Sequence, residues 1–217
     1  MTDQTTSSIA RQVRERRVQL MVDELEGIAL QLFAEQGFDN VTVEDIATAA
    51  AISSRTFYRY FPTKDDVLQV QIIRRAERLR DALSARHASE APIESLREAL
   101  ASEIAAEDPA RLRRWIDVVA SSGHAVRVVI GGIQLNTQRV IAEFFAARLG
   151  AAPDAYAATV LAAAAQGVIQ AAHTQWYLTG GDLATLIADG LAILEHGVGK
   201  PNDERPRRRG RRFSGDR

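Results

Sequence analysis

Apolar residues recur every three or four positions along most of the chain, a spacing that places them on one face of an α-helix. The first such run extends from Val18 to Leu32. Gly37 follows it, at a place where many helices end in a left-handed glycine. The pattern therefore predicts a first helix that begins near Val18.

Two short helices are predicted next. Thr42 and Ser53 are of the residue types that cap helix N-termini, and the second short helix cannot continue past Pro62. Thr63 then opens a long fourth helix, which is expected over about residues 63–87.

Beyond Pro92 the spacing of apolar residues stays helical. The expected helices cover about residues 93–107, a segment from Pro109, and then 124–149, 154–179 and 182–197. Gly131 and Gly132 lie inside the segment 124–149 and are expected to kink it. The sequence has no run of alternating apolar and polar residues bounded by hairpin turns. We therefore predict an all-α fold of about nine helices.

Composition narrows the class of protein. The chain has 217 residues, of which 46% are hydrophobic and 25% charged, and it has no cysteine. Disulfide scaffolds, thiolate zinc sites and cysteine nucleophiles are therefore excluded. The N-terminal residues lack the apolar core of a signal peptide, and no apolar stretch reaches the ~20 residues that span a bilayer. These features predict a soluble, cytoplasmic protein that does not associate with membranes.

The formal net charge of −1 conceals an uneven distribution. Residues 1–80, 81–199 and 200–217 carry net charges of −1, −5 and +5. The last segment contains an arginine-rich run and too little apolar surface to offset the entropy of ordering, so 200–217 is predicted to be a disordered basic tail. Two roles are open for it: non-specific attraction to DNA, or solubility alone.

The segment from Thr42 to Lys64 carries the clearest functional pattern. Its apolar positions are suited to lock two short helices together at a tight turn near Ala51; they are Ile46, Ala50, Ile52, Phe57 and Phe61. The other side of the second helix presents small polar, arginine and tyrosine side chains, at Ser54, Arg55, Tyr58 and Arg59. Arginine bonds guanine edges in the major groove, and the first turn of a helix favours phosphate. The pattern is that of a helix-turn-helix DNA-binding unit.

This segment resembles the DNA-binding domain of the TetR family of bacterial transcriptional regulators. The resemblance covers about residues 18–68 and is carried by Phe33, Gly37-Phe38, Ile46-Ala47, Ile52-Ser53, Thr56-Phe57-Tyr58-Arg59-Tyr60-Phe61 and Lys64. Ala51 departs from the family pattern, which has glycine at this position. If the turn requires a positive φ, alanine adds strain of about 1 kcal/mol.

The resemblance implies which side chains contact DNA. Base edges are expected to be read by Ser54, Arg55 and Tyr58. Phosphates are expected to be contacted by Thr42, Thr56, Tyr60 and Lys64, with Arg59 on the same surface. The alternatives are that the two tyrosines are packing residues and that the two arginines form a solvated helix face.

Residues 1–17 are predicted to be a flexible basic arm in front of the helix-turn-helix domain. Their basic side chains are Arg11, Arg14, Arg16 and Arg17. This arm is suited to reach an adjacent DNA groove, but the same residues are equally compatible with the frayed, solvated start of the first helix.

Residues 69–199 are predicted to form a ligand-binding and dimerisation domain. The helix that contains Trp115, the run 140–144 before Arg148-Leu149-Gly150, and Trp176 resemble the branch of the TetR family that includes the mycofactocin regulator. That resemblance implies a small-molecule effector that is apolar or acyl-CoA-like, and no cofactor.

A polar stripe crosses the otherwise apolar helix predicted at 154–179. Its members fall at positions i, i+4, i+7 and i+11, and they are Gln166, Gln170, His173 and Tyr177. Because buried amides need partners, the stripe faces either a ligand or another subunit. Four residues of neighbouring helices are predicted to complete an apolar cavity with the stripe: Trp115, Val119, Ile133 and Gln134. No second ligand stands at metal-binding spacing from His173, so no metal site is predicted.

The sequence contains no phosphate-binding glycine loop, no Ser/His/Asp motif and no carboxylate pair that departs from the helical surface pattern, so no catalytic residues are predicted. The function predicted is that of a homodimeric transcriptional repressor that a ligand releases from a palindromic operator. Dimerisation is expected through 154–179 and 182–197. The alternative is an all-α small-molecule or protein-binding module without DNA activity.

Overall fold

A computed structural model describes residues 2–152 and 154–197, with side chains from residue 11 onward. The first half of this part contains α1 (Thr2–Gln36), the 3-10 turn η1 (Phe38–Asn40), α2 (Val43–Ala49), α3 (Ser54–Tyr58) and α4 (Asp65–Ser84). The second half contains α5 (Pro92–Ala105), α6 (Pro109–Ala120), α7 (Gly123–Ile133), the π-helical segment η2 (Gln134–Gln138), α8 (Arg139–Leu149), α9 (Tyr156–Thr179) and α10 (Leu183–His196). The described ranges hold no strand, which confirms the predicted all-α class.

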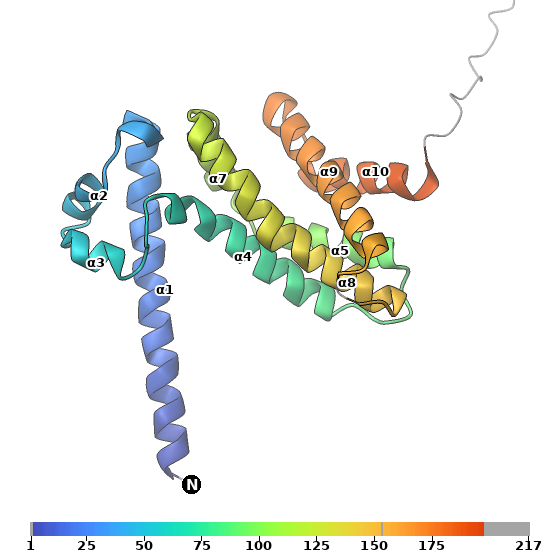
Figure 1. The fold of residues 1–217 in the computed structure, drawn as a ribbon, viewed down its shortest axis with the longest axis horizontal. Coiled ribbons are helices and arrows are strands. Elements are labelled where there is room, and N and C mark those ends of the chain that lie inside the picture. Colours follow the sequence, from blue (N-terminus) through green and yellow to red (C-terminus); the bar gives the residue numbers. More distant parts are fainter. Residues whose placement is uncertain (1, 153, 198–217) are drawn as a thin grey trace, which may run out of the picture.

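The N-terminal unit is built around aromatic side chains. α2 and α3 lie on one side of the C-terminal half of α1 (Figure 1). Phe33, Phe38, Ile46 and Phe57 are buried between these elements, and the rings of Phe33 and Phe38 meet edge to face with centroids 4.8 Å apart. These apolar positions are the ones that the sequence pattern assigned to the core.

The start of α1 differs from the prediction. The helix begins at Thr2 and not near Val18, so most of the segment 1–17 belongs to a continuous helix and not to a flexible arm. No proline or glycine interrupts residues 2–26, and such a sequence permits a helix to continue. The side chains of residues 11–20 are exposed, which agrees with the solvated helix start that we held as the alternative. The predicted tail 200–217 lies outside the described residues.

α4 connects the N-terminal unit to a second, larger group of helices. It contacts α1 on one side and α5, α7, η2 and α8 on the other, and Figure 1 shows it running away from α1 into the second unit. α9 packs between α8 and α10. At the α9–α10 crossing, a Cβ added to Gly190 would lie 2.5 Å from Cγ1 of Val168, so glycine is what allows this close approach.

The predicted helix 124–149 is interrupted, although not at its two glycines. The α-helix continues through Gly131 and Gly132, and the π-helical segment begins at Gln134. A Cβ on Gly132 would lie 1.8 Å from Oε1 of Gln69, whose Nε2 donates to the carbonyl of Val128 (2.8 Å). Gly132 therefore serves the close contact between α4 and α7 and produces no kink.

Within the described ranges, no helix combines the length and the apolar character that crossing a membrane requires.

Candidate DNA-binding surface and ligand cavity

The turn between α2 and α3 has the strained residue that the sequence pointed to. Ala51 has φ 54°, and among the described residues no other non-glycine residue has a positive φ. The N–H of Ile52 donates to the carbonyl of Ala47 (2.9 Å), which closes the turn. Alanine therefore holds a conformation that favours glycine, at a cost of about 1 kcal/mol.

α3 is short and is held in place from one side. Oγ of Ser53 accepts a hydrogen bond from the N–H of Thr56 (3.1 Å) and caps the helix. Phe57 is fully buried, and its ring centroid lies 5.4 Å from that of Phe61. Because one face of α3 is fixed in the core, the other face is presented to solvent with a defined orientation.

The predicted base-reading residues lie on that solvent face. Arg55 and Arg59 are exposed, Ser54 is half-buried, and Tyr58 has 49% of its surface exposed. Tyr58 also packs edge to face on Phe57, with centroids 5.9 Å apart, so it combines a packing contact with an exposed phenol. Within the described part of the chain, Arg55 has no ion-pair partner. Its guanidinium is therefore available to an external acceptor.

Several of the predicted phosphate contacts are already bonded within the protein. Oγ1 of Thr42 and the carboxylate of Asp45 form a capping box on α2, and these hydrogen bonds hold the pKa of Asp45 below its usual value. Nη2 of Arg59 donates to the hydroxyl of Tyr60 (3.0 Å). Oγ1 of Thr56 lies 2.9 Å from Oγ of Ser53. These side chains are held at the surface by local bonds, and their contacts with DNA stay predictions.

Lys64 has a structural role that the sequence did not reveal. Its Nζ donates to the carbonyls of Phe38 (2.7 Å) and Val41 (2.9 Å) and lies 4.5 Å from the centroid of the Phe38 ring. Lys64 thus fastens the start of α4 to the connection between α1 and α2. An ammonium group has three donors, so one of them is left for a phosphate.

A cluster of buried charges joins the N-terminal unit to the second unit. The carboxylate of Glu26 in α1 is fully buried and accepts hydrogen bonds from Arg74 of α4 and Arg111 of α6, each at 2.8 Å. Arg74 also pairs with Asp23. Burial raises the pKa of Glu26, while the two guanidinium groups oppose this rise. Sequence spacing gives no signal for such a cluster, because its members come from three helices.

A second contact between the units lies at the connection from α6 to α7. Oγ of Ser122 donates to the carboxylate of Asp39 (3.0 Å), and Nε2 of His124 lies 2.7 Å from Oδ2 of Asp65. The His124 ring also stacks on Phe38 with centroids 6.0 Å apart. α6 is therefore tied to the N-terminal unit near both of its ends.

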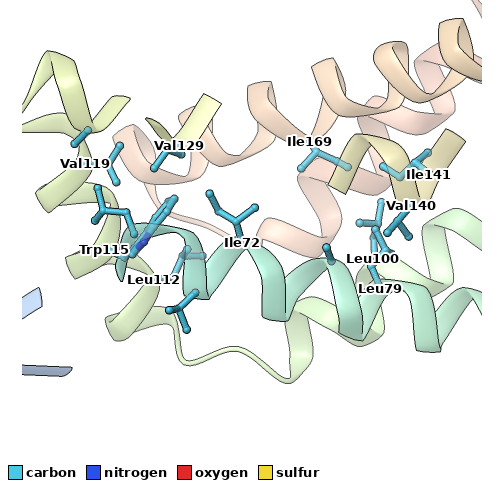
Figure 2. Close-up of a cluster of buried hydrophobic side chains, with 14 of the residues drawn as sticks. Ile72, Leu79, Leu100, Leu112, Trp115, Val119, Val129, Val140, Ile141 and Ile169 are labelled. Atoms are coloured by element: carbon cyan, nitrogen blue, oxygen red, sulfur yellow. The ribbon is translucent and has the colours of Figure 1, made fainter. Parts of the chain in front are cut away.

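The second unit encloses a cavity of about 510 Å³. All eight residues that we predicted to line a pocket are on its wall: Trp115, Val119, Ile133, Gln134, Gln166, Gln170, His173 and Tyr177. Figure 2 shows three further elements of this region meeting, with Ile72 of α4, Trp115 of α6 and Val129 of α7 around the same space. The polar stripe of α9 thus faces a cavity within one subunit, and its role in binding a ligand stays a prediction.

Sequence reasoning missed the part of the wall that comes from α4 and α5. Gln71 and Arg75 of α4 and Glu103 of α5 line the cavity. Glu103 accepts from Nε and Nη2 of Arg75 (3.0 and 3.1 Å) and from Arg78 (2.9 Å). These guanidinium groups hold the pKa of Glu103 low despite its burial. The positions follow the buried stripe of α4 at helical spacing, so polar residues beside that stripe were the available signal.

His173 is a neutral hydrogen-bond acceptor on the cavity wall. Its Nδ1 donates to the carbonyl of Ile169 (2.8 Å), so the proton is on Nδ1 and Nε2 carries a lone pair. Burial, together with the nearby charge of Arg75, lowers the pKa of His173 to about 4. Three buried polar atoms of the wall have no partner among the described residues: Nε2 of His173, Nε1 of Trp115 and Oε1 of Gln166.

The comparisons with known proteins agree with both parts of this geometry. Residues 28–70 match the family described as bacterial regulatory proteins, tetR family. Residues 90–199, about half of the chain, match the MftR C-terminal domain family. The chain belongs to the TetR family. This TetR-family protein is accordingly a DNA-binding transcriptional regulator with an MftR-type C-terminal domain, and its family is not enzymatic.

Relatives of this TetR-family chain are similar over different parts of it. The transcriptional regulator TcmR of Streptomyces glaucescens is 37% identical over 84 residues, which are 39% of this chain and 37% of TcmR. The crystal structure of the TetR-family repressor FadR of Thermus thermophilus, solved with lauroyl-CoA, has 22% identity, covers 85% of this chain and 98% of its own, and gives a TM-score of 0.57. FadR from Bacillus halodurans has 20% identity, coverage of 82% and 96%, and a TM-score of 0.59. At these identities, the two structures show a common fold only.

Proposed function

We propose that this regulator is a homodimeric repressor that binds a palindromic operator and leaves it when a small molecule occupies the cavity. The observation that carries the proposal is the position of α6. Leu112, Trp115 and Val119 of this helix line the cavity, and Arg111 of the same helix pairs with the buried Glu26 of α1. A ligand that displaces α6 therefore acts directly on the contact with the N-terminal unit.

The reading of DNA is assigned to the outer face of α3. Ser54, Arg55 and Tyr58 contact base edges, because this face is exposed while the opposite face is fixed in the core. The phosphate contacts are assigned to Thr42, Thr56, Arg59, Tyr60 and Lys64. Arg59 and Tyr60 are bonded to each other, which limits their side-chain freedom before DNA arrives. We place the protein in the cytoplasm, where its operator DNA is found.

The dimer is assigned to α9 and α10. Both helices expose large apolar side chains: Val160, Leu161 and Leu178 on α9, and Ile193 and Leu194 on α10. An apolar surface of this kind marks a protein interface in a chain that has to remain in solution. A twofold dimer brings two copies of α3 to one side, so the operator is palindromic with half-sites roughly 34–36 Å apart.

The effector fits the cavity and is mostly apolar. A volume of about 510 Å³ lies within the range of roughly 300–1,000 Å³ that is usual for small-molecule sites. Ile130, Gln134, Gln170 and Thr174 line the cavity and are exposed, so it opens to the surface between α7 and α9. Occupation of the cavity favours a position of α6 that the ion pair Arg111–Glu26 does not permit, which shifts the population away from the DNA-binding arrangement.

Selection of bound duplexes from a random pool, with the purified full chain, tests the proposal. The expected result is one palindromic sequence, bound with an affinity that falls as salt increases because phosphate contacts release counterions. Enrichment of no sequence would overturn the proposal, and enrichment of a single half-site would overturn its dimeric form. A probe that binds in the cavity is then added to the operator complex, and dissociation of the DNA is expected.

A further inference from the structure

The cavity wall has a hydrogen-bonding pattern that is specific to one class of ligand. Nε1 of Trp115 only donates, and Nε2 of His173 only accepts because its proton is on Nδ1. Neither atom has a partner among the described residues. Leaving a buried polar group without a hydrogen bond costs about 1–3 kcal/mol, so a ligand that satisfies both atoms gains affinity from them.

The charged groups of the wall are already neutralised. Arg75 uses Nε and Nη2 on the two carboxylate oxygens of Glu103, and Arg78 bonds the same carboxylate. An anionic group in the cavity has to displace Glu103 from Arg75 and leave that carboxylate buried without its partner. Because unpaired buried charges are strongly unfavourable, the interior of the cavity excludes carboxylates and phosphates.

We propose that the cavity selects an uncharged, mostly apolar molecule that carries a hydroxyl group, which accepts from Nε1 of Trp115 and donates to Nε2 of His173. A hydroxyl is the smallest group that does both. An ether or ester oxygen satisfies the tryptophan and leaves the histidine unpaired, and a carboxylate adds the charge that the wall cannot accommodate. Oε1 of Gln166 lies seven residues before His173, about two helical turns along the same face of α9, and takes a second donor of a larger ligand. This inference rests on the cavity being the effector site of the proposed function.

The test uses isothermal titration calorimetry on the full chain with three probes of similar chain length. They are 1-decanol, 1-methoxynonane, which has the same heavy atoms but no hydroxyl proton, and decanoate. We expect 1-decanol to bind about tenfold more tightly than the ether, because one hydrogen-bond donor is worth about that factor. Decanoate is expected to bind more weakly than both. Equal affinity for alcohol and ether, tightest binding of decanoate, or no binding of 1-decanol would each overturn the inference.

Two variants separate the roles of the wall residues. His173→Phe is expected to remove the preference for 1-decanol over the ether and to leave the affinity for the ether nearly unchanged. Trp115→Phe is expected to weaken both probes by a similar factor, because both accept from the indole. Gln175→Ala, an exposed position of α9 that does not line the cavity, is the matched control and keeps the wild-type affinities. If His173→Phe does not fold, the probe series on the wild-type chain still decides.

Failure of the inference is distinguishable from failure of the proposed function. The calorimetry needs no DNA, and operator release is measured separately with the same probes. Selective binding of 1-decanol without release of the operator supports the inference and contradicts the proposed mechanism. Release of the operator by decanoate or lauroyl-CoA, together with tighter binding of that anion, supports the mechanism and overturns the inference.

Discussion

The carboxylate of Glu26 and the guanidinium of Arg111 lie 2.8 Å apart, although 85 residues separate them in the sequence. Glu26 belongs to the helix that supports the DNA-binding unit, and Arg111 lies one helical turn from Trp115 on the cavity wall. The two proposed binding sites are therefore joined through one buried ion pair and one helix.

We expect the substitution Glu26→Ala to lower the free energy of unfolding by about 3 kcal/mol. The substitution leaves Arg74 and Arg111 without their shared buried carboxylate, and loss of one partner of a buried pair typically costs this much. Urea denaturation followed by circular dichroism measures the change. Glu24→Ala, an exposed neighbour on α1, is the control, and an equal effect of the two substitutions would contradict the role given to Glu26.

Arg55→Ala is expected to weaken binding to the selected operator by about 1–3 kcal/mol, because a bidentate contact to a base edge is lost. Fluorescence anisotropy with a labelled duplex measures the affinity. Arg114→Ala removes an exposed arginine of α6 and serves as the control, with an expected change near zero. Unchanged operator affinity in Arg55→Ala would show that α3 does not read bases.

Ala51→Gly is expected to stabilise the protein by about 0.5–1 kcal/mol. Ala51 has φ 54°, a conformation that glycine adopts without strain, and this gain exceeds the entropy that glycine adds to the unfolded chain. Ala147→Gly in the exposed face of α8 is the comparison, and it is expected to destabilise by up to about 1 kcal/mol. Urea denaturation of both variants decides, since opposite signs are expected.

Gly167→Arg is expected to convert the dimer into monomers and to abolish operator binding. A Cβ at Gly167 meets no atom within 4 Å in its own subunit, so the substitution leaves the fold of the subunit intact. The arginine projects from the exposed face of α9, where the partner subunit is proposed to pack. Sedimentation velocity measures the mass, and a dimer that persists at micromolar concentration would place the interface elsewhere.

The low pKa of His173 predicts a loss of stability in acid. Its pKa is about 4 in the folded state, against an ordinary value of 6.5, so the unfolded chain binds the proton first. Stability that is complete above pH 6.5 is therefore lost as the pH falls toward 4, by up to about 3 kcal/mol at about 1.4 kcal/mol per pKa unit. The free energy of unfolding of His173→Phe, measured over the same pH range, is expected to fall less steeply. Arg75 and Glu103 face the histidine and are common to both proteins, so parallel curves would contradict the assignment.

The helices and the DNA-binding surface were predictable because their signals are local. Helical spacing, the caps at Thr42 and Ser53 and the turn at Ala51 all depend on residues within one or two turns of each other. The stripe on α9 was predictable for the same reason. The long start of α1 was not, because its side chains are solvated and carry no periodic apolar signal.

By itself the sequence determined the helical class, the position of the helix-turn-helix unit and the face of α9 that is polar, since each depends on spacing along a single helix. Only the tertiary structure decided that Lys64 bonds the carbonyls before α2, that Glu26 joins three helices, and that the stripe of α9 faces a cavity in its own subunit. The physical reason is that buried charges and cavity walls form between helices that are distant in sequence. Their partners are fixed by how the helices pack and not by the pattern within any one of them.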